Sequence, residues 1–309
     1  MITNKEKSFL SAVVYMHDSE ETIGGFLDQL ASALEDNFEK YEIICVNDAS
    51  EDRCAAIVRE KKESLPDCVI RIVNMSFFQG LETAMNAGVD LAVGDFVFEF
   101  DTTAVDYGPA LIMEVYNKSL EGYDIVAARN SKKRIESSFF YKVFNNASGS
   151  HNKLASESFR ILSRRAINRI HSLNKTLPYR KALYYNSGLK TQTITYKPTS
   201  VLTYSHTKQE HKNRQEIALS SLVLFTDIAY KFSFGLAILM MIATIATGVY
   251  VLIVFLYGQP VSGFSSMMWV ISGCFFGVFA ILAIIIKYLS LLIDLVFKKQ
   301  KYVVESIET

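Results

Sequence analysis

The first 130 residues alternate between short β-rich runs and longer stretches with a helical hydrophobic period. Runs of β-branched and aromatic residues predict strands at Phe9–Tyr15, Tyr41–Val46, Val69–Val73, Phe96–Phe100 and Asp124–Ala128. Apolar positions three and four apart predict helices at Glu20–Asn37, Asp52–Glu63, Leu81–Ala92 and Pro109–Leu120. This alternation predicts an α/β fold with a mostly parallel sheet flanked by helices.

The pattern becomes less regular between residues 131 and 212. Ser163–Leu173 has a helical period, and Ser163 is a suitable N-cap. Thr191–Tyr196 alternates as a strand does. We interpret residues 1–212 as one α/β domain.

Two long apolar runs near the end of the chain change this picture. Phe232–Tyr257 and Ser265–Ile286 carry no charged residue, and a Gly- and Pro-containing turn joins them. A helix needs about 20 apolar residues to cross a bilayer. We therefore predict two transmembrane helices, 232–257 and 265–286. The alternatives are buried core helices and a hydrophobic tail that packs on protein.

Positive charges predict the orientation of these spans. Lys231 precedes the first span, Lys287 and Lys298 follow the second, and the connecting turn carries no charge. The positive-inside rule then places both termini in the cytoplasm and the protein in the cell membrane. Residues 213–231 and 287–309 separate polar from apolar positions at helical spacing, which favours amphipathic helices in the headgroup layer. The alternative is amphipathic packing on the domain or on a partner subunit.

Composition narrows the functional classes. Lysine plus arginine and aspartate plus glutamate both number 32, so the net charge gives no argument for nucleic-acid binding. The four cysteines show neither close pairing nor zinc spacing with histidines, which argues against a disulfide framework or a structural metal. In a parallel sheet, ligands bind at the carboxyl ends of the strands. Three loops there carry acidic or amide side chains: Met16–Glu20, Asn47–Asp52 and Asp101–Asp106.

The order of these loops, followed by the apolar hairpin, resembles family 2 glycosyltransferases with the GT-A fold. It resembles most the polyprenyl-phosphate glycosyltransferases, which include dolichol-phosphate mannose synthase and bacterial undecaprenyl-phosphate enzymes. Val13–Glu21 stands where that group has Val-Pro-Val-Tyr-Asn-Glu-Glu, and Cys45–Ser50 stands for Val-Asp-Asp-Gly-Ser. Ala127–Arg129 stands for Gly-Ser-Arg, and Ser158–Arg164 for Asp-Phe-Arg-Leu-Leu-Ser-Arg.

The resemblance implies an inverting enzyme that moves a sugar from a nucleotide sugar, a UDP-sugar first of all, to polyprenyl phosphate at the cytoplasmic face. The sugar would later enter a surface polysaccharide or another glycosylated polymer. The resemblance also implies a homo-oligomer, with a tetramer as the expected form. The acceptor phosphate is already ionised, so a strong general base is not essential.

The resemblance also assigns roles to individual residues. Nucleotide binding falls to Tyr15, Asp18, Asn47, Asp48 and Asp101. Asp48 has a local alternative, because Asp also favours helix caps and Asx-turns at such positions.

Catalysis falls to Asp101 and Arg160, and contact with the diphosphate or lipid phosphate to Arg129, Arg160 and Arg164. The alternative for Arg160 and Arg164 is a run of surface arginines. Ser158 replaces the family Asp before Phe-Arg. Glu157 is a possible substitute, but on a strand it is expected to face the other side.

The metal motif of the family is depleted in this chain. The family holds Mg²⁺ or Mn²⁺ through an Asp-X-Asp and a following Gln. Here Asp101 keeps the first position, Thr103 and Val105 replace the ligands, and Asp106 matches a further Asp. Three interpretations stay open: Asp101 and Asp106 hold the cation weakly through water, arginines neutralise the diphosphate instead, or catalysis is lost. In the last case the chain binds a nucleotide sugar or a membrane partner without turnover.

Overall fold

The computed structural model describes residues 5–66, 68–131, 157–173, 180–199, 263–297 and 302–309, together with most positions from 231 to 246 and residue 249. The chain forms two compact units. The first is Met1–Ala218 together with Lys299–Thr309, and the second is Leu219–Lys298. Each is described by itself below.

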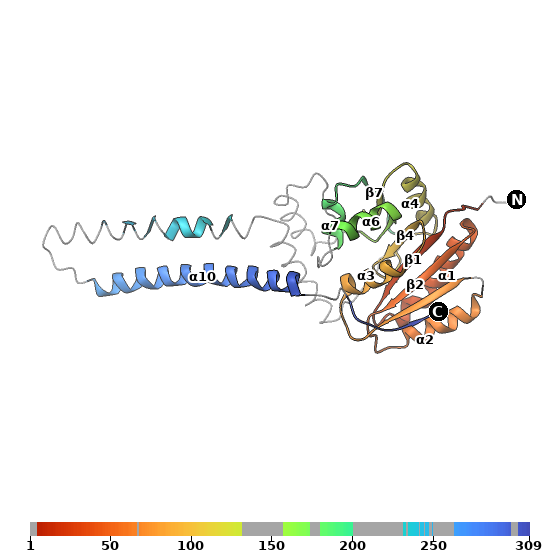
Figure 1. Ribbon diagram of the computed structural model, residues 1–309, viewed down its shortest axis with the longest axis horizontal. Coiled ribbons are helices and arrows are strands. Elements are labelled where there is room, and N and C mark those ends of the chain that lie inside the picture. Colours follow the sequence, from red (N-terminus) through yellow and green to blue (C-terminus); the bar gives the residue numbers. More distant parts are fainter. Residues whose placement is uncertain are drawn as a thin grey trace. The chain divides into compact units, whose positions relative to one another are not determined.

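The first unit is built on a sheet of eight strands in the order β7-β5-β6-β4-β1-β2-β3-β8. Figure 1 shows this sheet with its flanking helices. Its strands are β1 (Leu10–Met16), β2 (Tyr41–Asn47), β3 (Val69–Met75), β4 (Phe96–Phe100), β5 (Ile125–Asn130), β6 (Phe159–Ser163), β7 (Thr191–Tyr196) and β8 (Val304–Glu308). Strands β3, β2, β1 and β4 are parallel neighbours, as are β5 and β7. Strand β6 runs antiparallel between β4 and β5, and β8 antiparallel along β3. The predicted mostly parallel sheet is confirmed.

The helices follow the strands closely in sequence. They are α1 (Glu20–Asn37), α2 (Cys54–Ser64), α3 (Leu81–Leu91), α4 (Ala110–Leu120), α6 (Arg164–Leu173) and α7 (Arg180–Asn186). The first four agree with the predicted ranges to within two residues at each end. Ser163 caps α6 as predicted, because its hydroxyl accepts the Ala166 N–H at 3.2 Å. Helix α7 was not predicted.

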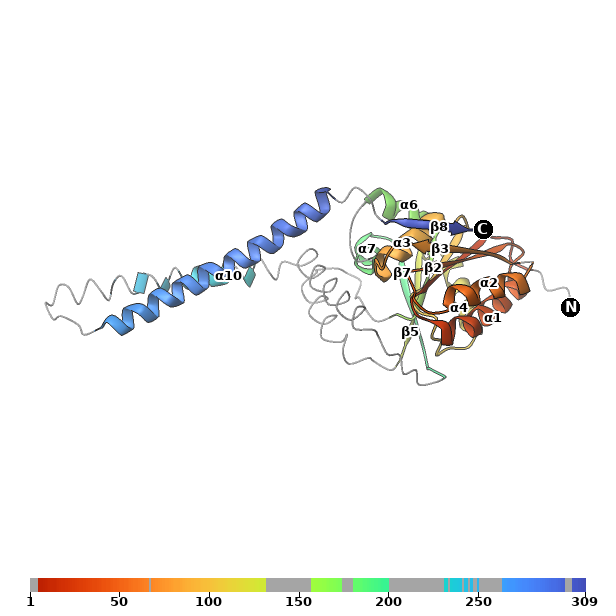
Figure 2. The same cartoon turned by 90° about the horizontal axis from the view of Figure 1, so that it is seen from below.

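The helices cover both faces of the sheet (Figure 2). Along β1, Leu10 and Val14 pack into a cluster with residues of α1, α2 and α4. The alternate residues Val13 and Tyr15 pack into a second cluster with α3, α6 and α7. Side chains alternate between the faces of a strand, so a sheet covered on both sides needs apolar residues at nearly every position. This explains the continuous apolar runs of the central strands.

Gly88 allows α3 to approach the sheet closely. A Cβ at this position would lie 2.4 Å from Val13 Cγ1 and 2.6 Å from Val46 Cγ2. Both valines are β-branched and fully buried, so they have little freedom to move away. A glycine here fixes the height of α3, and of the loop that precedes it, above strands β1 and β2.

The second unit contains α10 (Phe264–Phe297), a continuous helix of 34 residues. It contains the whole predicted span 265–286 and continues into the segment predicted as a cytoplasmic helix. Its exposed large apolar side chains include Met267, Val270, Ile271, Phe275, Phe276, Val278, Phe279, Leu282, Ile285, Ile286, Leu289 and Leu292.

A membrane-crossing helix is not identified in the described part of the chain, where none is both long enough and apolar enough to span a bilayer. Segment 213–230 and much of the predicted span 232–257 lie outside the described residues. The two predicted spans therefore stay predictions.

Adding a methyl group at Gly88 tests the close approach of α3. Gly88→Ala is expected to lower the free energy of unfolding of the full chain by about 1–3 kcal/mol, because the new Cβ overpacks the core. The matched control is Gly25→Ala on α1, where nothing lies within 4 Å of the added Cβ. That variant is expected to be neutral or about 0.4–1 kcal/mol more stable. Urea denaturation followed by circular dichroism measures both, and equal effects would contradict the packing argument.

Candidate functional site

Three polar loops meet at one edge of the sheet, as the sequence predicts. They follow β1, β2 and β4, which are parallel neighbours and therefore end at the same edge. The Asp18 carboxylate in the first loop accepts the Glu51 N–H of the second at 2.8 Å. The hydroxyl groups of Thr22 and Thr103 lie 2.6 Å apart and connect the first loop's helix to the third loop.

Two tight backbone conformations mark the first two loops. Among the described residues, Asp18 (φ 45°) and Ala49 (φ 52°) are the non-glycine positions with positive φ. This left-handed conformation costs roughly 1–2 kcal/mol for a residue with a Cβ. Such strain concentrates at functional sites, because the surrounding structure must hold it in place. Asp18 is the more accessible of the two candidate carboxylates in these loops, with 35% of its side chain exposed.

Asp48 is fully buried and supports the loop before α3. Its carboxylate accepts the Gln79 N–H and the Gly80 N–H, both at 2.8 Å, and the Tyr15 hydroxyl at 3.1 Å. Burial raises the pKa of Asp48, although these hydrogen bonds favour the charged form. The carboxylate therefore fixes the junction between β3 and α3. A role in nucleotide binding stays a prediction for Tyr15 and Asp48.

Asn47 connects β2 to its own loop and to the neighbouring strand. Its Oδ1 accepts the Ser50 N–H, three residues further on, at 3.1 Å and so stabilises the turn after β2. Its Nδ2 donates to Oδ1 of Asn74 on β3 at 2.9 Å. Asn47 is thus held by both ends of its amide, and its nucleotide role also stays a prediction.

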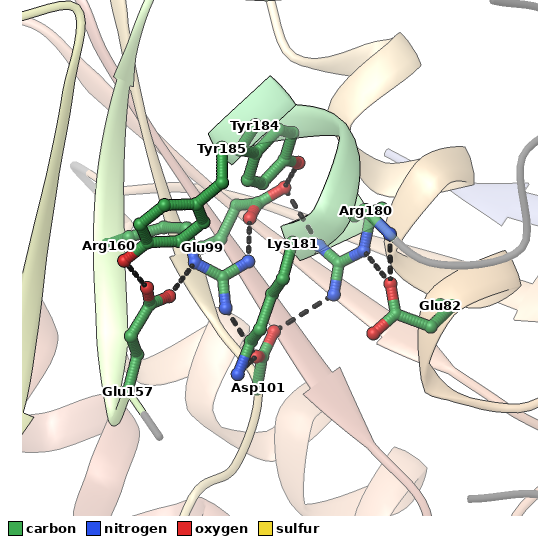
Figure 3. A network of polar contacts seen from close by, with 9 residues as sticks. All are labelled: Glu82, Glu99, Asp101, Glu157, Arg160, Arg180, Lys181, Tyr184 and Tyr185. Atoms are coloured by element: carbon green, nitrogen blue, oxygen red, sulfur yellow. Dashed lines mark hydrogen bonds and ion pairs between the residues drawn. The ribbon is translucent and has the colours of Figure 1, made fainter. Parts of the chain in front are cut away.

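Asp101 follows β4 and lies in a network of buried ion pairs (Figure 3). Its Oδ2 accepts from Arg160 Nη2 at 2.7 Å, and its Oδ1 accepts from Arg180 Nη2 at 3.0 Å. The Lys181 ammonium lies 3.5 Å from Oδ2. Arg160 belongs to β6, whereas Arg180 and Lys181 belong to α7. The network therefore joins the sheet edge to a helix that lies about 80 residues further along the chain.

Glu99 lies in the middle of this network and has no solvent exposure. It accepts hydrogen bonds from Arg160 Nη1 at 2.5 Å, Arg180 Nη1 at 2.8 Å and the Tyr184 hydroxyl at 2.6 Å. A carboxylate without water needs such partners, because an unpaired buried charge is very costly. Glu99 is thus the residue around which both arginines are oriented.

Two further carboxylates pair with the Nε atoms of the two arginines. Glu157 accepts from Arg160 Nε at 2.9 Å, and Glu82 accepts from Arg180 Nε at 3.0 Å. The ion pairs of the network connect three cations with four carboxylates: Arg160, Arg180 and Lys181 with Glu82, Glu99, Asp101 and Glu157. Negative charge exceeds positive by one. Both guanidinium groups are almost fully buried, so a phosphate reaches either of them only if the network rearranges.

Asp101 stays ionised in this setting. Burial opposes its ionisation, but Arg160, Arg180 and Lys181 together outweigh burial and hold the pKa of Asp101 far below its usual range. Asp101 therefore offers a permanent negative charge, and it lies near the surface, with 10% of its side chain exposed.

The antiparallel register of β6 decides which arginine reaches the site. Arg160 lies directly opposite Glu99 on β4, and directly opposite residues point to the same face of a sheet. Arg164 lies beyond the other end of β6, where it donates to the carbonyl oxygens of Ala92 at 2.8 Å and Gly94 at 3.0 Å. The structure thus separates Arg164 from Arg160 and Asp101 by the length of β4.

Glu157 does not face away from the site, so that expectation was wrong. Strand β6 begins at Phe159, and Glu157 precedes it, so the alternation of a strand does not apply. Its carboxylate also accepts the Tyr185 hydroxyl at 2.7 Å. Ser158, which replaces the family Asp, lies instead with its hydroxyl 2.5 Å from that of Tyr196.

Asp106 is held by partners of its own. It accepts from Asn130 Nδ2 at 2.6 Å and from the Tyr196 hydroxyl. Arg129, at the end of β5 beside Asn130, is half-buried. Asp106 and Arg129 are therefore grouped at the β5–β7 side of the site, and none of the recorded contacts of Asp106 in the described residues involves the Asp101 network.

The side chains at this edge do not fit a preformed divalent metal site. Within the described part of the chain, no three or more His, Cys, Asp and Glu residues form a group that would hold a metal ion. Both oxygens of Asp101 already accept from guanidinium groups. Thr103 is buried against Thr22, and Val105 packs on the core. As a metal ligand, Asp101 would share its carboxylate between the cation and the positive charges of Arg160, Arg180 and Lys181.

Sequence reasoning missed Glu82 and Glu99 as members of the site, and it did not assign Arg180 and Lys181 to it. One signal was present in the sequence. Glu99 is a single acidic residue inside the otherwise apolar strand Phe96–Phe100. A charge in a strand buried on both faces requires a cationic partner. The sequence does not indicate which of the chain's cations supplies it.

Comparison with known proteins identifies the family. The family model described as "Glycosyl transferase family 2" matches residues 11–171, slightly more than half of the chain. The chain belongs to this family. The matched range contains β1 to β6, and with them all three polar loops and Arg160.

Individual relatives and a solved structure are consistent with this family assignment. An uncharacterized glycosyltransferase of Bacillus subtilis strain 168 is 27% identical over 308 residues, 96% of this chain and 93% of that protein. A bactoprenol glucosyl transferase of Shigella phage SfX is 25% identical over 269 residues, 84% of this chain and 86% of that protein. The mannosyltransferase PcManGT of Pyrobaculum calidifontis, solved with GDP-Man and Mn²⁺, superposes with a TM-score of 0.50 at 15% identity, over 90% of this chain and 88% of that one.

Neutralising Glu99 tests its place in the network. Glu99→Gln is expected to lower the free energy of unfolding by about 3–5 kcal/mol, because two buried arginines lose their shared counter-charge. The control Asp28→Asn removes an exposed partner of Lys61 and is expected to change stability by less than about 1 kcal/mol. Urea denaturation of the full chain measures both. A loss for Glu99→Gln no larger than for the control would contradict the proposed role of Glu99.

The pH dependence of stability tests the ionisation of Asp101. A depressed pKa in the folded state adds stability that is present above the unfolded pKa, about 3.9, and is lost as the pH falls through the folded pKa. The stability difference between the native chain and Asp101→Asn is therefore expected to be constant above about pH 5 and to shrink below about pH 4. Urea denaturation at a series of pH values measures this difference. A difference that grows on acidification would show that Asp101 is protonated in the folded chain.

Proposed function

We propose that this chain transfers a sugar from a nucleotide sugar to a polyprenyl phosphate at the cytoplasmic face of a membrane. The observation that carries this proposal is the extent of its likeness to the bactoprenol glucosyl transferase of Shigella phage SfX. That alignment covers 84% of this chain, whereas the family domain ends at residue 171. The likeness therefore extends beyond the residues that the family model matches and includes part of the C-terminal apolar region.

The donor fits the loops that follow β1 and β2. Asp18, Asn47 and Asp48, three of the predicted nucleotide-binding residues, lie in or beside these loops. Asp18 itself has a positive φ, and Asp48 precedes Ala49, which also has one. PcManGT, which has the same fold, was solved with GDP-Man, and this supports a nucleotide sugar as the donor. The preference for a UDP-sugar rests on the sequence resemblance alone.

The proposed transfer is a single displacement with inversion. An oxygen of the acceptor phosphate forms a bond to the anomeric carbon while the bond from that carbon to the diphosphate breaks. The electron pair leaves with the nucleoside diphosphate. Because the acceptor oxygen is ionised, no side chain has to remove a proton from it. The replacement of the family Asp by Ser158 is compatible with this chemistry.

The leaving diphosphate needs positive charge as it develops. Lys181 is the cation best placed to supply it, because its 3.5 Å pair with Asp101 is the longest in the network and an ammonium on a flexible stem reorients readily. Arg160 and Arg180 are each fixed by three or more hydrogen bonds. A divalent cation, Mg²⁺ or Mn²⁺, is compatible with the fold, as the Mn²⁺ in PcManGT indicates.

The membrane part of the proposal rests on the uncharged runs 232–257 and 265–286 and on the lysines that flank them. The exposed apolar side chains of α10 support it, because a contiguous apolar surface of this extent requires a partner or lipid. Such an anchor would hold the site at the height of lipid headgroups, where the acceptor phosphate lies. The amphipathic segments and the homo-oligomer stay predictions.

The decisive experiment is sugar transfer by the purified full chain. Incubation with undecaprenyl phosphate and radiolabelled UDP-sugars is expected to yield labelled lipid. Asp101→Ala is expected to lower the rate about 100-fold or more, because Lys181 loses the carboxylate that holds it in place for the leaving diphosphate. Asp28→Ala, at an exposed position away from the three loops, serves as the control and is expected to keep full activity.

The other outcomes separate the parts of the proposal. Donor binding without labelled lipid, for every donor and cation, would support the catalytically silent alternative. Activity that survives EDTA would assign charge neutralisation to protein cations such as Lys181. Recovery of the chain in the soluble fraction without detergent would contradict the membrane part.

A further inference from the structure

The last described segment of the chain, residues 302–309, lies against the domain that begins the chain. We name it the tail segment. It contains β8, which pairs antiparallel with β3 at the edge of the sheet, so that Val73 lies opposite Ile307. It comes shortly after α10 in sequence, yet it belongs to the first compact unit. Beyond the strand pairing, its hydrogen bonds reach Arg59, Asn74, Ser76, Gln79 and Asp90.

One set of contacts leads from the tail segment to Asp48. The Gln79 side chain forms a pair of hydrogen bonds with the backbone of Val303: Nε2 donates to the carbonyl at 2.6 Å, and Oε1 accepts the N–H at 3.0 Å. The Ser76 N–H donates to the same carbonyl at 3.2 Å. The backbone N–H of Gln79 in turn donates to Asp48 Oδ1. Val303 and Asp48 therefore hold opposite ends of one residue.

A second set leads to Asn47. Glu308 accepts from Arg59 Nε at 2.8 Å and Nη2 at 2.7 Å, and from Asn74 Nδ2 at 2.7 Å. Asn74 in turn accepts from Asn47 Nδ2 through its Oδ1. The orientation of the Asn74 amide is thereby fixed from both sides. The hydrogen bond from Arg59 outweighs partial burial and lowers the pKa of Glu308 to about 2, so this carboxylate is charged at neutral pH.

Tyr302 and Val304 pack against the second apolar cluster, and the other recorded side-chain contacts of the tail segment are polar. In β8, Glu305, Ser306 and Ile307 are exposed, so the strand buries little apolar surface. A strand that only protects a sheet edge needs main-chain pairing and no particular side chains. Here two specific side-chain connections end at neighbouring residues of one loop. This convergence distinguishes a positioning role from simple edge protection.

We infer that the tail segment positions the loop Asn47–Ala49 for the nucleoside diphosphate part of the donor, with Gln79 and Asn74 as the positioning residues between them. This inference rests on the proposed function, because it takes Asn47 and Asp48 as the nucleotide subsite. Without the tail segment, the Gln79 side chain loses both of its partners on Val303, and Asn74 loses Glu308. The loop before α3 and the end of β2 then lose part of their support, and the strained turn at Ala49 relaxes.

Variants on both connections test this inference in the full chain. Gln79→Ala and Glu308→Ala are each expected to raise the KM for the nucleotide sugar about tenfold, the effect of losing one or two good hydrogen bonds. The kcat and the KM for undecaprenyl phosphate are expected to stay within about twofold. The dissociation constant for UDP, measured by titration calorimetry, is expected to rise by the same factor as the KM for the donor.

Two variants separate positioning from a merely structural role. Glu308→Gln keeps an acceptor for Asn74 and is expected to recover part of the donor affinity that Glu308→Ala loses. Glu305→Ala, at an exposed position of the same strand, is expected to leave donor affinity unchanged. A general fall in kcat and melting temperature with an unchanged KM for the donor would overturn the inference. Equal effects of Glu305→Ala and Glu308→Ala would also overturn it.

The two proposals fail in different ways. If the native chain binds UDP but transfers no sugar, and the variants weaken UDP binding, the proposed function falls and the inference stands. If the native chain transfers sugar, and Gln79→Ala has the same KM for the donor and the same affinity for UDP, the inference is wrong and the proposed function stands. A native chain that neither binds UDP nor transfers sugar overturns both.

Discussion

The buried charge of Glu99 is the constraint on which the candidate site depends. It lies on the central strand β4, on a sheet covered by helices on both faces, so water cannot compensate its charge. Arg160 and Arg180 supply that compensation from β6 and α7 through their Nη1 atoms. The Nη2 atom of each guanidinium then donates to Asp101. The position of Asp101 therefore depends on ion pairs that form only after distant parts of the chain have come together.

The excess of one negative charge affects how the network interacts with a phosphate. A buried ion-pair group with fewer carboxylates than cations would attract a phosphate directly. This group instead keeps its arginines paired and leaves Lys181, which has the longest ion pair of the network, as its most loosely held cation. The network thus orders Asp101 and Lys181 beside each other, and these are the two of its charged side chains with the largest exposed fraction.

The sequence predicts the parallel part of the fold well and the network poorly. Strands β1 to β4 and helices α1 to α4 arise from local periodicity, which one sequence displays directly. The pairing of Glu99 with Arg160 depends on the antiparallel register of β6, and that of Glu99 with Arg180 on a seven-residue helix. The partner residues are 61 and 81 positions apart. Local patterns carry no information about which of many arginines occupies such a position, and this is also why Arg164 was grouped with Arg160.

Because the tail segment is made last, the order of synthesis affects when the chain can bind its donor. The ribosome makes the sheet and its polar loops first, then the apolar region that contains α10, and residues 302–309 after both. If that segment completes the donor subsite, a nascent chain with all its catalytic residues still binds the nucleotide sugar weakly. Donor sugar is then not consumed by chains that are still being synthesised. A contact between distant residues would in this way time the start of activity during biogenesis.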